Sequence, residues 1–469
     1  MAVSQFGNTT SRYWLVPPAV LIASWLVALV SDTALLGWTL LVIVAMGSAV
    51  LLIRNLPLGL LSFVFASLLI PISFGTGTQT SIGINIVTLA GLMGIWILRA
   101  TARPEERLLP RSSTVLPLLV LCAVALLSFG IGQLPWFTFA EGAPLRAQLG
   151  GLATFLLSAG VFLLSATQIR SLDWLKRISW LFLAIGGLVV LSRLVGGPFR
   201  FIGHLETRGA TGSLFWIWLT ALAFSQAVLN GRLRRGWRIV LLALAAVVFY
   251  LNLFQHSRWA SGWIPPLVAV VVILWIGVPR IGILASLGGA FALLVNPHRL
   301  RDIVMAGDNE YSLLTRLEAW RIIGEIVRAS PLLGLGPANY YWYAPLFPIL
   351  GYSVRFSSHN NFVDIVAQTG ILGLICFLWF GLALARVAWR LLKQAPGGFA
   401  HAYLIGALGG LAGTLAAGML GDWVIPFVYN IGLDGMRASL IGWMFLGGVV
   451  ALEQMARRGQ FEMVEALDR

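Results

Sequence analysis

The sequence predicts an all-α polytopic membrane protein with about 14 transmembrane helices and one long loop outside the membrane. The chain is 58% hydrophobic and only 11% charged, with a mean hydropathy of +0.87, which excludes an ordinary soluble domain. Apolar runs of about 17 or more residues recur throughout, and each is long enough to cross a hydrocarbon core of about 30 Å. These runs lack the alternation of a membrane β-barrel, so helices, which satisfy their own backbone groups, are expected.

The apolar runs give the expected positions of the membrane helices, to within several residues. They lie near 13–30, 34–53, 57–73, 81–99, 114–131, 150–168, 176–195, 213–229, 237–254, 261–278, 281–296, 361–388, 400–419 and 436–453. The first run carries no small-residue cleavage site, so we expect it to be a membrane helix and not a removed signal peptide. Only Pro279 and Arg280 separate the tenth and eleventh runs, which predicts a tight hairpin.

The net charge of +14 is best explained by membrane topology, and no nucleic-acid partner is expected. Arginine-rich short loops alternate with loops that hold few basic residues, and the rich loops are expected on the cytoplasmic side together with both termini. This order predicts three parts: N-terminal membrane helices (1–296), an outer, periplasmic loop (297–360) and C-terminal membrane helices with a short tail (361–469).

Several arginines of the predicted outer loops run against this charge bias. They are Arg193, Arg200, Arg208, Arg258, Arg299, Arg301, Arg316, Arg321, Arg328 and Arg355. One interpretation is ion pairing with acids of the same loops, and the other is binding of an anionic ligand, for which the guanidinium fork is suited. Pairing does not account for the first three, which have only Glu206 beside them.

Within the outer loop, residues 311–329 predict an amphipathic helix that Pro331 ends. Arg316 and Trp320 are four residues apart and share a face. Arg316 has no acid four residues away on either side, which favours a role in ligand binding. A second set of charged residues predicts a solvated ion-pair ladder: Arg321, Glu325 and Arg328.

Two further stretches of the loop follow this helix. Gly334-Leu335-Gly336-Pro337 predicts a turn whose glycines permit close backbone approach, without the lysine of a nucleotide-binding loop. The aromatic run 340–343 fits an interfacial belt better than the alternative, a platform for stacking sugars.

His359 stands where the loop re-enters the apolar sequence. Ser358, Asn360 and Asn361 flank it, and Asp364 follows about one turn later. Such a polar patch at the start of a membrane helix is costly unless it is used. Neither a metal nor another cofactor is expected, because the acid pair of the predicted outer loop, in Asp308-Asn309-Glu310, is a weak match to a metal site, and Cys122 and Cys376 lie in separate apolar runs.

An ordered set of motifs over the C-terminal two-thirds resembles the bacterial O-antigen ligase and O-antigen polymerase superfamily. The matching pieces are Thr207-Arg208-Gly209 with Gly212, His256-Ser257-Arg258, Arg316 with Trp320 and the stretch 331–337, and Ser358-His359-Asn360 followed by Gly370 and Gly373. The chain departs from the family at Ser213-Leu214-Phe215-Trp216, where an asparagine-proline-asparagine stretch is common, and residues 1–110 carry no matching motif.

The resemblance implies a GT-C-type fold and an inverting, metal-independent glycosyl transfer at the outer face of the bacterial inner membrane. The donor would be a glycan on undecaprenyl diphosphate, and the acceptor a sugar hydroxyl of lipid A–core. The residues suit this chemistry in three roles: diphosphate binding by Arg208, Arg258 and Arg316, proton transfer or substrate binding by His359, and further substrate contacts from Asn360, Trp320 and Arg200.

Three alternatives stay open at this point. A polymerase of the same superfamily shares the motifs and differs only in its acceptor. A polysaccharide or lipid transporter would share the bundle, but transporters usually place ionisable residues deep within their spans, and here the span centres carry few charges. A purely structural membrane protein is the least favoured.

Overall fold

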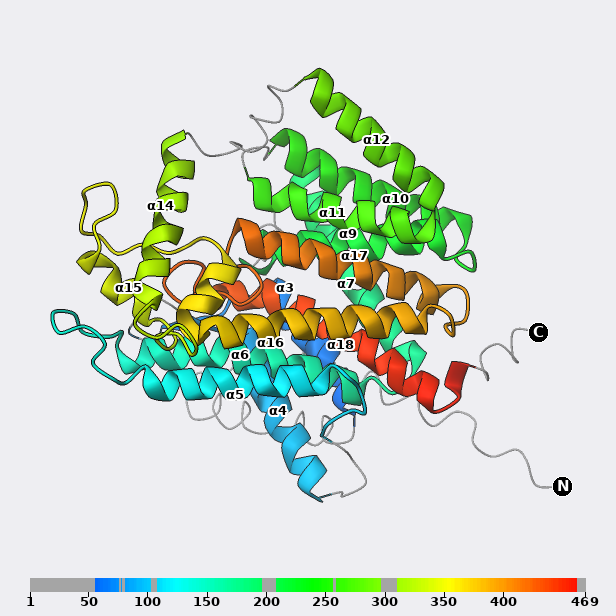
Figure 1. Cartoon of the computed structure of the whole chain (residues 1–469). Coiled ribbons are helices and arrows are strands. Elements are labelled where there is room, and N and C mark those ends of the chain that lie inside the picture. Colours follow the sequence, from blue (N-terminus) through cyan, green and yellow to red (C-terminus); the bar gives the residue numbers. More distant parts are fainter. Residues whose placement is uncertain are drawn as a thin grey trace, which may run out of the picture.

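The computed structural model describes residues 55–75, 77, 81–102, 108–195, 208–255, 259–296 and 310–461 of the 469-residue chain. These residues form a bundle in which most of the long helices lie side by side (Figure 1). Eight of the described helices are long and apolar enough to cross a membrane. The expectation of an all-α membrane protein is therefore confirmed, whereas the count of 14 spans stays a prediction.

The first part of the bundle contains one small hairpin and nine α-helices among the described residues. In chain order the elements are α3 (Leu56–Leu69), β1 (Ser73–Gly75), β2 (Ser81–Gly83), α4 (Ile84–Ala102), α5 (Val115–Ile131), α6 (Leu145–Gln168), α7 (Leu172–Val195), the 3-10 turn η3 (Arg208–Thr211), α9 (Ser213–Leu229), α10 (Arg235–Tyr250), the π turn η4 (Leu251–Gln255), α11 (Ala260–Gly277) and α12 (Pro279–Val295). The tight hairpin predicted between the last two helices is present, with Val278 between them.

The second part begins with α14 (Glu310–Val327), α15 (Asn339–Tyr343) and η5 (Ala344–Leu346), and continues with α16 (Asn361–Leu391), α17 (Phe399–Leu420), η6 (Leu433–Gly435) and α18 (Met436–Arg457). Every predicted span from 57–73 onward coincides with one of the described helices to within a few residues. The first two predicted spans, 13–30 and 34–53, lie outside the described residues, as do residues 297–309 of the predicted outer loop.

The core of the bundle forms around α18, which is buried along almost its whole length. It packs against α6, α9 and α16. Trp218 stacks on Phe445 with ring centres 5.4 Å apart, and Phe380 stacks on Trp443 at 5.3 Å. Gly447 lets α18 approach α6 closely, because a Cβ there would lie 2.5 Å from the Phe162 carbonyl oxygen. Close packing of this kind is what associates helices in a membrane, where burial of apolar surface gives no advantage over lipid.

A buried arginine fixes the end of α3 to the start of α18. Arg437 is only 3% exposed and donates to the carbonyl oxygens of Ala66, Ile70 and Ile72 at 2.9–3.3 Å. These acceptors include carbonyls that the end of a helix leaves without an intrahelical partner. Arg437 therefore has a structural role.

α16 is broken near its start, and the segment between α14 and α15 inserts into the break. Gly370 has φ 69° and ψ −175°, a conformation open essentially to glycine alone. Ile371 N donates to the Pro331 carbonyl, and Leu335 N donates to the Ala367 carbonyl, both at 3.0 Å. The segment that leads from α14 to α15 is thereby fixed to the helix that follows His359.

The predicted turn at 334–337 makes this insertion possible. Gly334 and Gly336 have φ of 68° and 85°, in the left-handed region that favours glycine. A Cβ on Gly334 would lie 2.6 Å from the backbone of Gln368, so only glycine permits the contact. The prediction of close backbone approach is confirmed.

The outer helix predicted at 311–329 is α14, and it ends before Pro331 as expected. Its buried face carries Ile322, Ile323 and Ile326 and packs against α15 and α16. Leu317, expected on the apolar stripe, is 48% exposed, because the buried face is centred on the later isoleucines. α14 and α15 lie at one end of the bundle, and the ends of α16 and α18 lie at the other (Figure 1).

Candidate functional site

A cavity of about 320 Å³ lies at the end of the bundle where α14 and α15 are found. Three segments far apart in the sequence build it: α14, the stretch from α15 to the start of α16, and the connection between α17 and α18. Its lining residues are Thr315, Arg316, Ala319, Tyr341, Ile349, Arg355, Phe356, Ser357, His359 and Tyr429. The lining thus combines two guanidinium groups, one imidazole and two phenol rings, and none of these residues is acidic.

Two of the residues predicted to act together, Arg316 and His359, therefore meet in one cavity although they lie 43 positions apart in the sequence. Arg355, one of the arginines that ran against the charge bias, joins them. The structure places all three side chains around the same space, which concentrates positive charge there.

Buried polar groups make hydrogen bonds that hold the turn carrying His359. His359 has φ 50°, an uncommon left-handed conformation for a residue with a side chain. The adjacent Ser358 is buried, and its Oγ donates to Asp364 while accepting from Asn360 N. Trp320 Nε1 donates to the Ser358 carbonyl at 2.8 Å. These bonds fix the backbone on both sides of His359 and so present its exposed ring to the cavity.

Tyr340 completes this buried network. Its hydroxyl donates to Asp364 Oδ1 at 2.6 Å and accepts from Ser358 N at 3.3 Å. Burial, with the nearby Asp364 charge, raises the pKa of Tyr340 well above its usual value, so the hydroxyl stays protonated and remains a donor.

The imidazole of His359 is oriented from its other side by the connection after α17. Asn430 Nδ2 lies 3.1 Å from His359 Nδ1, and the same amide nitrogen donates to Asp422 Oδ1. Ser357 Oγ lies 3.3 Å from His359 Nε2. Because an amide nitrogen only donates, Nδ1 accepts, and a neutral His359 then carries its proton on Nε2.

Asp422 sets the orientation of that amide. It is fully buried, and its Oδ2 accepts from Phe427 N at 2.8 Å and from Ile431 N at 3.5 Å. Burial raises the pKa of Asp422 above its usual value. When Asp422 is ionised, Asn430 must present hydrogens to it. When it is protonated, the amide can turn its oxygen toward His359, which would favour the tautomer with the proton on Nδ1.

The aromatic run 340–343 packs onto the connection between α17 and α18. Tyr340 stacks on Phe427 with ring centres 4.8 Å apart, and Tyr341 stacks on Tyr429 at 4.5 Å. Tyr343 is 1% exposed. The interfacial-belt interpretation is wrong for Tyr340 and Tyr343, because tertiary packing buries both inside the protein.

The ion-pair ladder predicted for Arg321, Glu325 and Arg328 is confirmed only for the first two, since Arg328 makes no ion pair within the described residues. Arg321 donates to Glu325, as predicted, and also to Glu318 at 2.6 Å, which the prediction did not include. The hydrogen bond from Arg321 lowers the pKa of Glu318. These residues do not line the cavity.

Two other predicted site residues, Asn360 and Trp320, do not line the cavity. Asn360 is buried and caps α16, its Oδ1 accepting from Phe362 N and Val363 N at 2.9 and 3.3 Å. The indole N–H of Trp320, its one side-chain donor, donates to the Ser358 carbonyl. Both side chains therefore hold the turn at His359, and direct contact of either with a substrate stays a prediction.

The remaining arginines of the prediction are only partly covered. Arg200 and Arg258 lie outside the described residues, and Arg208 begins η3 without a described side chain. Arg193 is explained by structure: its Nη2 donates to the Ala210 carbonyl, and its guanidinium lies 5.0 Å from the centre of the Trp216 ring.

Sequence reasoning missed Asp422, Asn430 and Tyr429. The one available signal was the lone acid of Gly421-Asp422-Trp423, directly after an apolar run. A buried acid at such a position needs partners, but the sequence does not show that an amide eight residues later bridges it to His359. Among the described residues, no three His, Cys, Asp or Glu side chains gather as a metal ion would require. Metal-independent transfer stays a prediction.

Comparison with known proteins adds one finding. Residues 201–378 match a family model described as O-antigen ligase. The matched segment contains Arg316, Arg355 and His359 and ends before Asp422 and Asn430. No curated protein matches the chain. The match supports the superfamily of O-antigen ligases and polymerases, in agreement with the resemblance of the motifs.

Proposed function

From its place in the O-antigen ligase and polymerase superfamily, we propose that this protein transfers a glycan from undecaprenyl diphosphate to a sugar hydroxyl of lipid A–core. The observation that carries the proposal is the cavity that Arg316, Arg355 and His359 share, in which none of the described lining residues is acidic. A leaving diphosphate gains negative charge as the glycosidic bond breaks, and a cationic, partly enclosed site stabilises that charge.

In this proposal Arg316 and Arg355 hold the diphosphate. Arg355 is positioned by the Trp342 ring, whose centre lies 3.7 Å from its guanidinium carbon. A guanidinium group binds phosphate oxygens in a bidentate way and stays charged throughout the reaction. One well-placed donor of this kind is worth about 3–4 kcal/mol of transition-state stabilisation.

Arg208 and Arg258 are proposed as further diphosphate ligands, and the residues around them support this. η3, which begins at Arg208, contacts η6. Trp259, which follows Arg258, packs edge-to-face on Trp423 with ring centres 5.8 Å apart. Both contacts are with the 421–435 connection that also orients His359. Arg200 stays a proposed substrate ligand only because it is one of the arginines that run against the charge bias.

His359 has two roles available, and its tautomer decides between them. With Asn430 as donor, Nε2 carries the proton and can donate to an oxygen of the diphosphate or of the acceptor. With Asp422 protonated and the amide turned, Nε2 can instead accept the proton of the attacking hydroxyl, as a general base. In the structure the Asn430 amide nitrogen faces Nδ1, so we propose that Nε2 of His359 acts as a hydrogen-bond donor.

The stacked rings of Tyr341 and Tyr429 are proposed to contact the sugar. Both line the cavity beside the two arginines, and a flat ring complements the apolar face of a pyranose. The sugar-stacking interpretation is thereby retained for Tyr341 alone among residues 340–343.

The test is transfer by the purified protein in proteoliposomes that contain radiolabelled, undecaprenyl-diphosphate-linked glycan and lipid A–core. A transferase moves the label onto lipid A–core covalently. A transporter changes only the side of the membrane on which the label is found, and that outcome would replace the proposal. If the label elongates on undecaprenyl diphosphate without lipid A–core, the protein is a polymerase of the same superfamily.

A further inference from the structure

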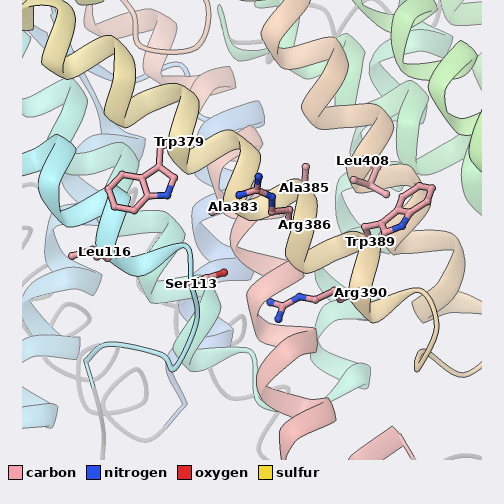
Figure 2. Close-up of a pocket in the computed structure, with 9 residues that line it drawn as sticks. All are labelled: Ser113, Leu116, Trp379, Ala383, Ala385, Arg386, Trp389, Arg390 and Leu408. Atoms are coloured by element: carbon pink, nitrogen blue, oxygen red, sulfur yellow. The ribbon is translucent and has the colours of Figure 1, made fainter.

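A second cavity lies at the opposite end of α16 from His359, between α5, α16 and α17 (Figure 2). Its volume is about 760 Å³. Four residues of α16 form one stripe along it: Trp379, Ala383, Arg386 and Arg390. Their spacings of four, three and four residues put them on one face of the helix. About 27 Å of helix separate the near edge of this groove, at Trp379, from the start of α16 beside His359, since a helix rises about 1.5 Å per residue.

The groove has two apolar walls with basic side chains between and below them. Figure 2 shows Leu116 of α5 and Trp379 on one side, Trp389 and Leu408 of α17 on the other, and Arg386 between them. Leu116 and Trp389 are 59% and 54% exposed, so both walls are open to the surroundings. In a chain that spans a membrane, such walls meet lipid chains, and tryptophan at this depth is typical of the interface.

The described residues neutralise the charge at the groove only in part. Arg390 Nη2 lies 3.8 Å from Glu453 Oε1, but the same oxygen already accepts from Arg457 at 3.0 Å. Arg386 has no hydrogen bond or ion pair within the part of the chain that the structure describes. Arg386 and Arg390 stand one helical turn apart, where like charges repel. An anion between them would remove that repulsion.

We propose that this groove binds one anionic glycerophospholipid, with its phosphate between Arg386 and Arg390 and one acyl chain along each wall. Guanidinium groups bind phosphate in a bidentate way, and basic pockets between membrane helices select anionic headgroups. The two walls on either side of Arg386 fit a lipid with two chains better than a polyprenyl phosphate with one. The proposal does not depend on the proposed transferase activity.

Native mass spectrometry of the full chain in detergent, titrated with palmitoyl-oleoyl phosphatidylglycerol, tests the headgroup. Each guanidinium near a phosphate contributes roughly fivefold in affinity, so Arg386→Gln/Arg390→Gln should lose about 30-fold for the tightest bound lipid. The matched control is Arg234→Gln/Arg235→Gln, two exposed arginines at the start of α10, which should bind as the unaltered chain does. Equal loss in both double variants, or equal binding of phosphatidylcholine and phosphatidylglycerol by the unaltered chain, overturns the proposal. Tighter retention of undecaprenyl phosphate also overturns it.

A second measurement asks what occupies the groove. Ala383→Cys, in a background with Cys122→Ser and Cys376→Ser, places a thiol between the walls. Its alkylation by a membrane-permeant maleimide should slow at least fivefold when phosphatidylglycerol is added, and phosphatidylcholine should leave the rate unchanged. A thiol that is blocked even without lipid, and becomes reactive on removal of residues 1–54, would show instead that the chain itself fills the groove.

Discussion

The two ends of α16 both carry arginines, yet the protein holds them in opposite ways. Beside His359, Arg316 and Arg355 come from separate segments of the chain. Hydrogen bonds of Ser358 with Asp364 and of Asn430 with His359 hold the turn and the ring of His359 in place. At the far end, Arg386 and Arg390 are neighbours on one helix and face apolar walls. One cationic site is made by tertiary structure, and the other by the helical repeat. The first is therefore the more sensitive to single changes in the backbone and in buried polar groups.

The largest effect is expected from the cationic groups of the candidate site. Arg316→Ala and His359→Ala should each lower the transfer rate about 10²–10³-fold or more, because each removes a group placed at the developing charge. Rates in proteoliposomes with saturating donor give the measure. Arg328→Ala is the matched control, an exposed arginine directly after α14 that does not line the cavity. Full activity in both site variants would end the proposed mechanism.

The break that separates the two ends of α16 gives the second prediction. Gly370→Ala should destabilise the protein by about 1–3 kcal/mol or more, because its φ of 69° with an extended ψ excludes a Cβ, which would also collide with the Leu332 carbonyl. Gly381→Ala, on the same helix with open space around it, should leave stability unchanged or raise it slightly. Thermal unfolding in detergent compares the two. Equal midpoints would show that the break is not required.

The third prediction concerns the orientation of His359. Asn430→Ala should lower transfer about 10–100-fold, a part of what a positioned histidine contributes, and should change its pH profile. In the unaltered protein, ionisation of Asp422 fixes the donor tautomer, and burial moves that ionisation to higher pH than usual for an aspartate. Transfer should therefore rise as Asp422 ionises.

The variant should lose that rise, because nothing then links Asp422 to the imidazole. Ser357→Ala removes the other close partner of the ring and should have the smaller effect. A rise that survives in Asn430→Ala would mean that Asp422 acts on the site by another route. A rate that instead falls as Asp422 ionises would favour the general-base role for His359.

Much of this fold could be predicted because its signals are local. Hydropathy placed the helices from α3 to α18 to within a few residues, and Pro331 and the two glycines of 334–337 marked the end of α14 and the turn. The groove at Arg386 and Arg390 also rests on a helical repeat that the sequence displays. Arg386 and Arg390, however, belong to the arginine-rich stretches that membrane topology already explains, so their pattern alone does not indicate a ligand site.

The candidate site could be predicted only in part, because its contacts are not local. Arg316 and His359 were found through motif order, but Asp422 and Asn430 reach His359 only after α17 has crossed the bundle. The role of Asn360 as the cap of α16 could not be predicted, because a polar residue beside a catalytic candidate is ambiguous until its hydrogen bonds are known. Tyr340 and Tyr343 were assigned to the membrane interface because composition does not distinguish an interfacial ring from a buried one.

A moderate effect is expected from the aromatic wall of the cavity. Tyr341→Ala should raise the KM for the acceptor or donor about tenfold, because a ring contact is worth roughly 0.5–1.5 kcal/mol. Tyr341→Phe keeps the ring and should behave nearly as the unaltered protein does. Initial rates over a range of substrate concentrations separate KM from kcat. A large fall in kcat for Tyr341→Phe would point to a role of the hydroxyl and not of the stacked ring.

The smallest effect is expected where an arginine is neither enclosed nor near a substrate. Arg321 pairs with Glu318 and Glu325 on the exposed face of α14, and its hydrogen bond lowers the pKa of Glu318. A lowered acid pKa stabilises the fold at neutral pH and loses that contribution as the pH falls through it. Solvent screens this pair, so Arg321→Gln should leave both the unfolding midpoint and the transfer rate unchanged within error at pH 7 and at pH 4. A clear loss of transfer would mean that the ladder belongs to the cationic site, and that α14 presents its outer face as well as Arg316 to the substrate.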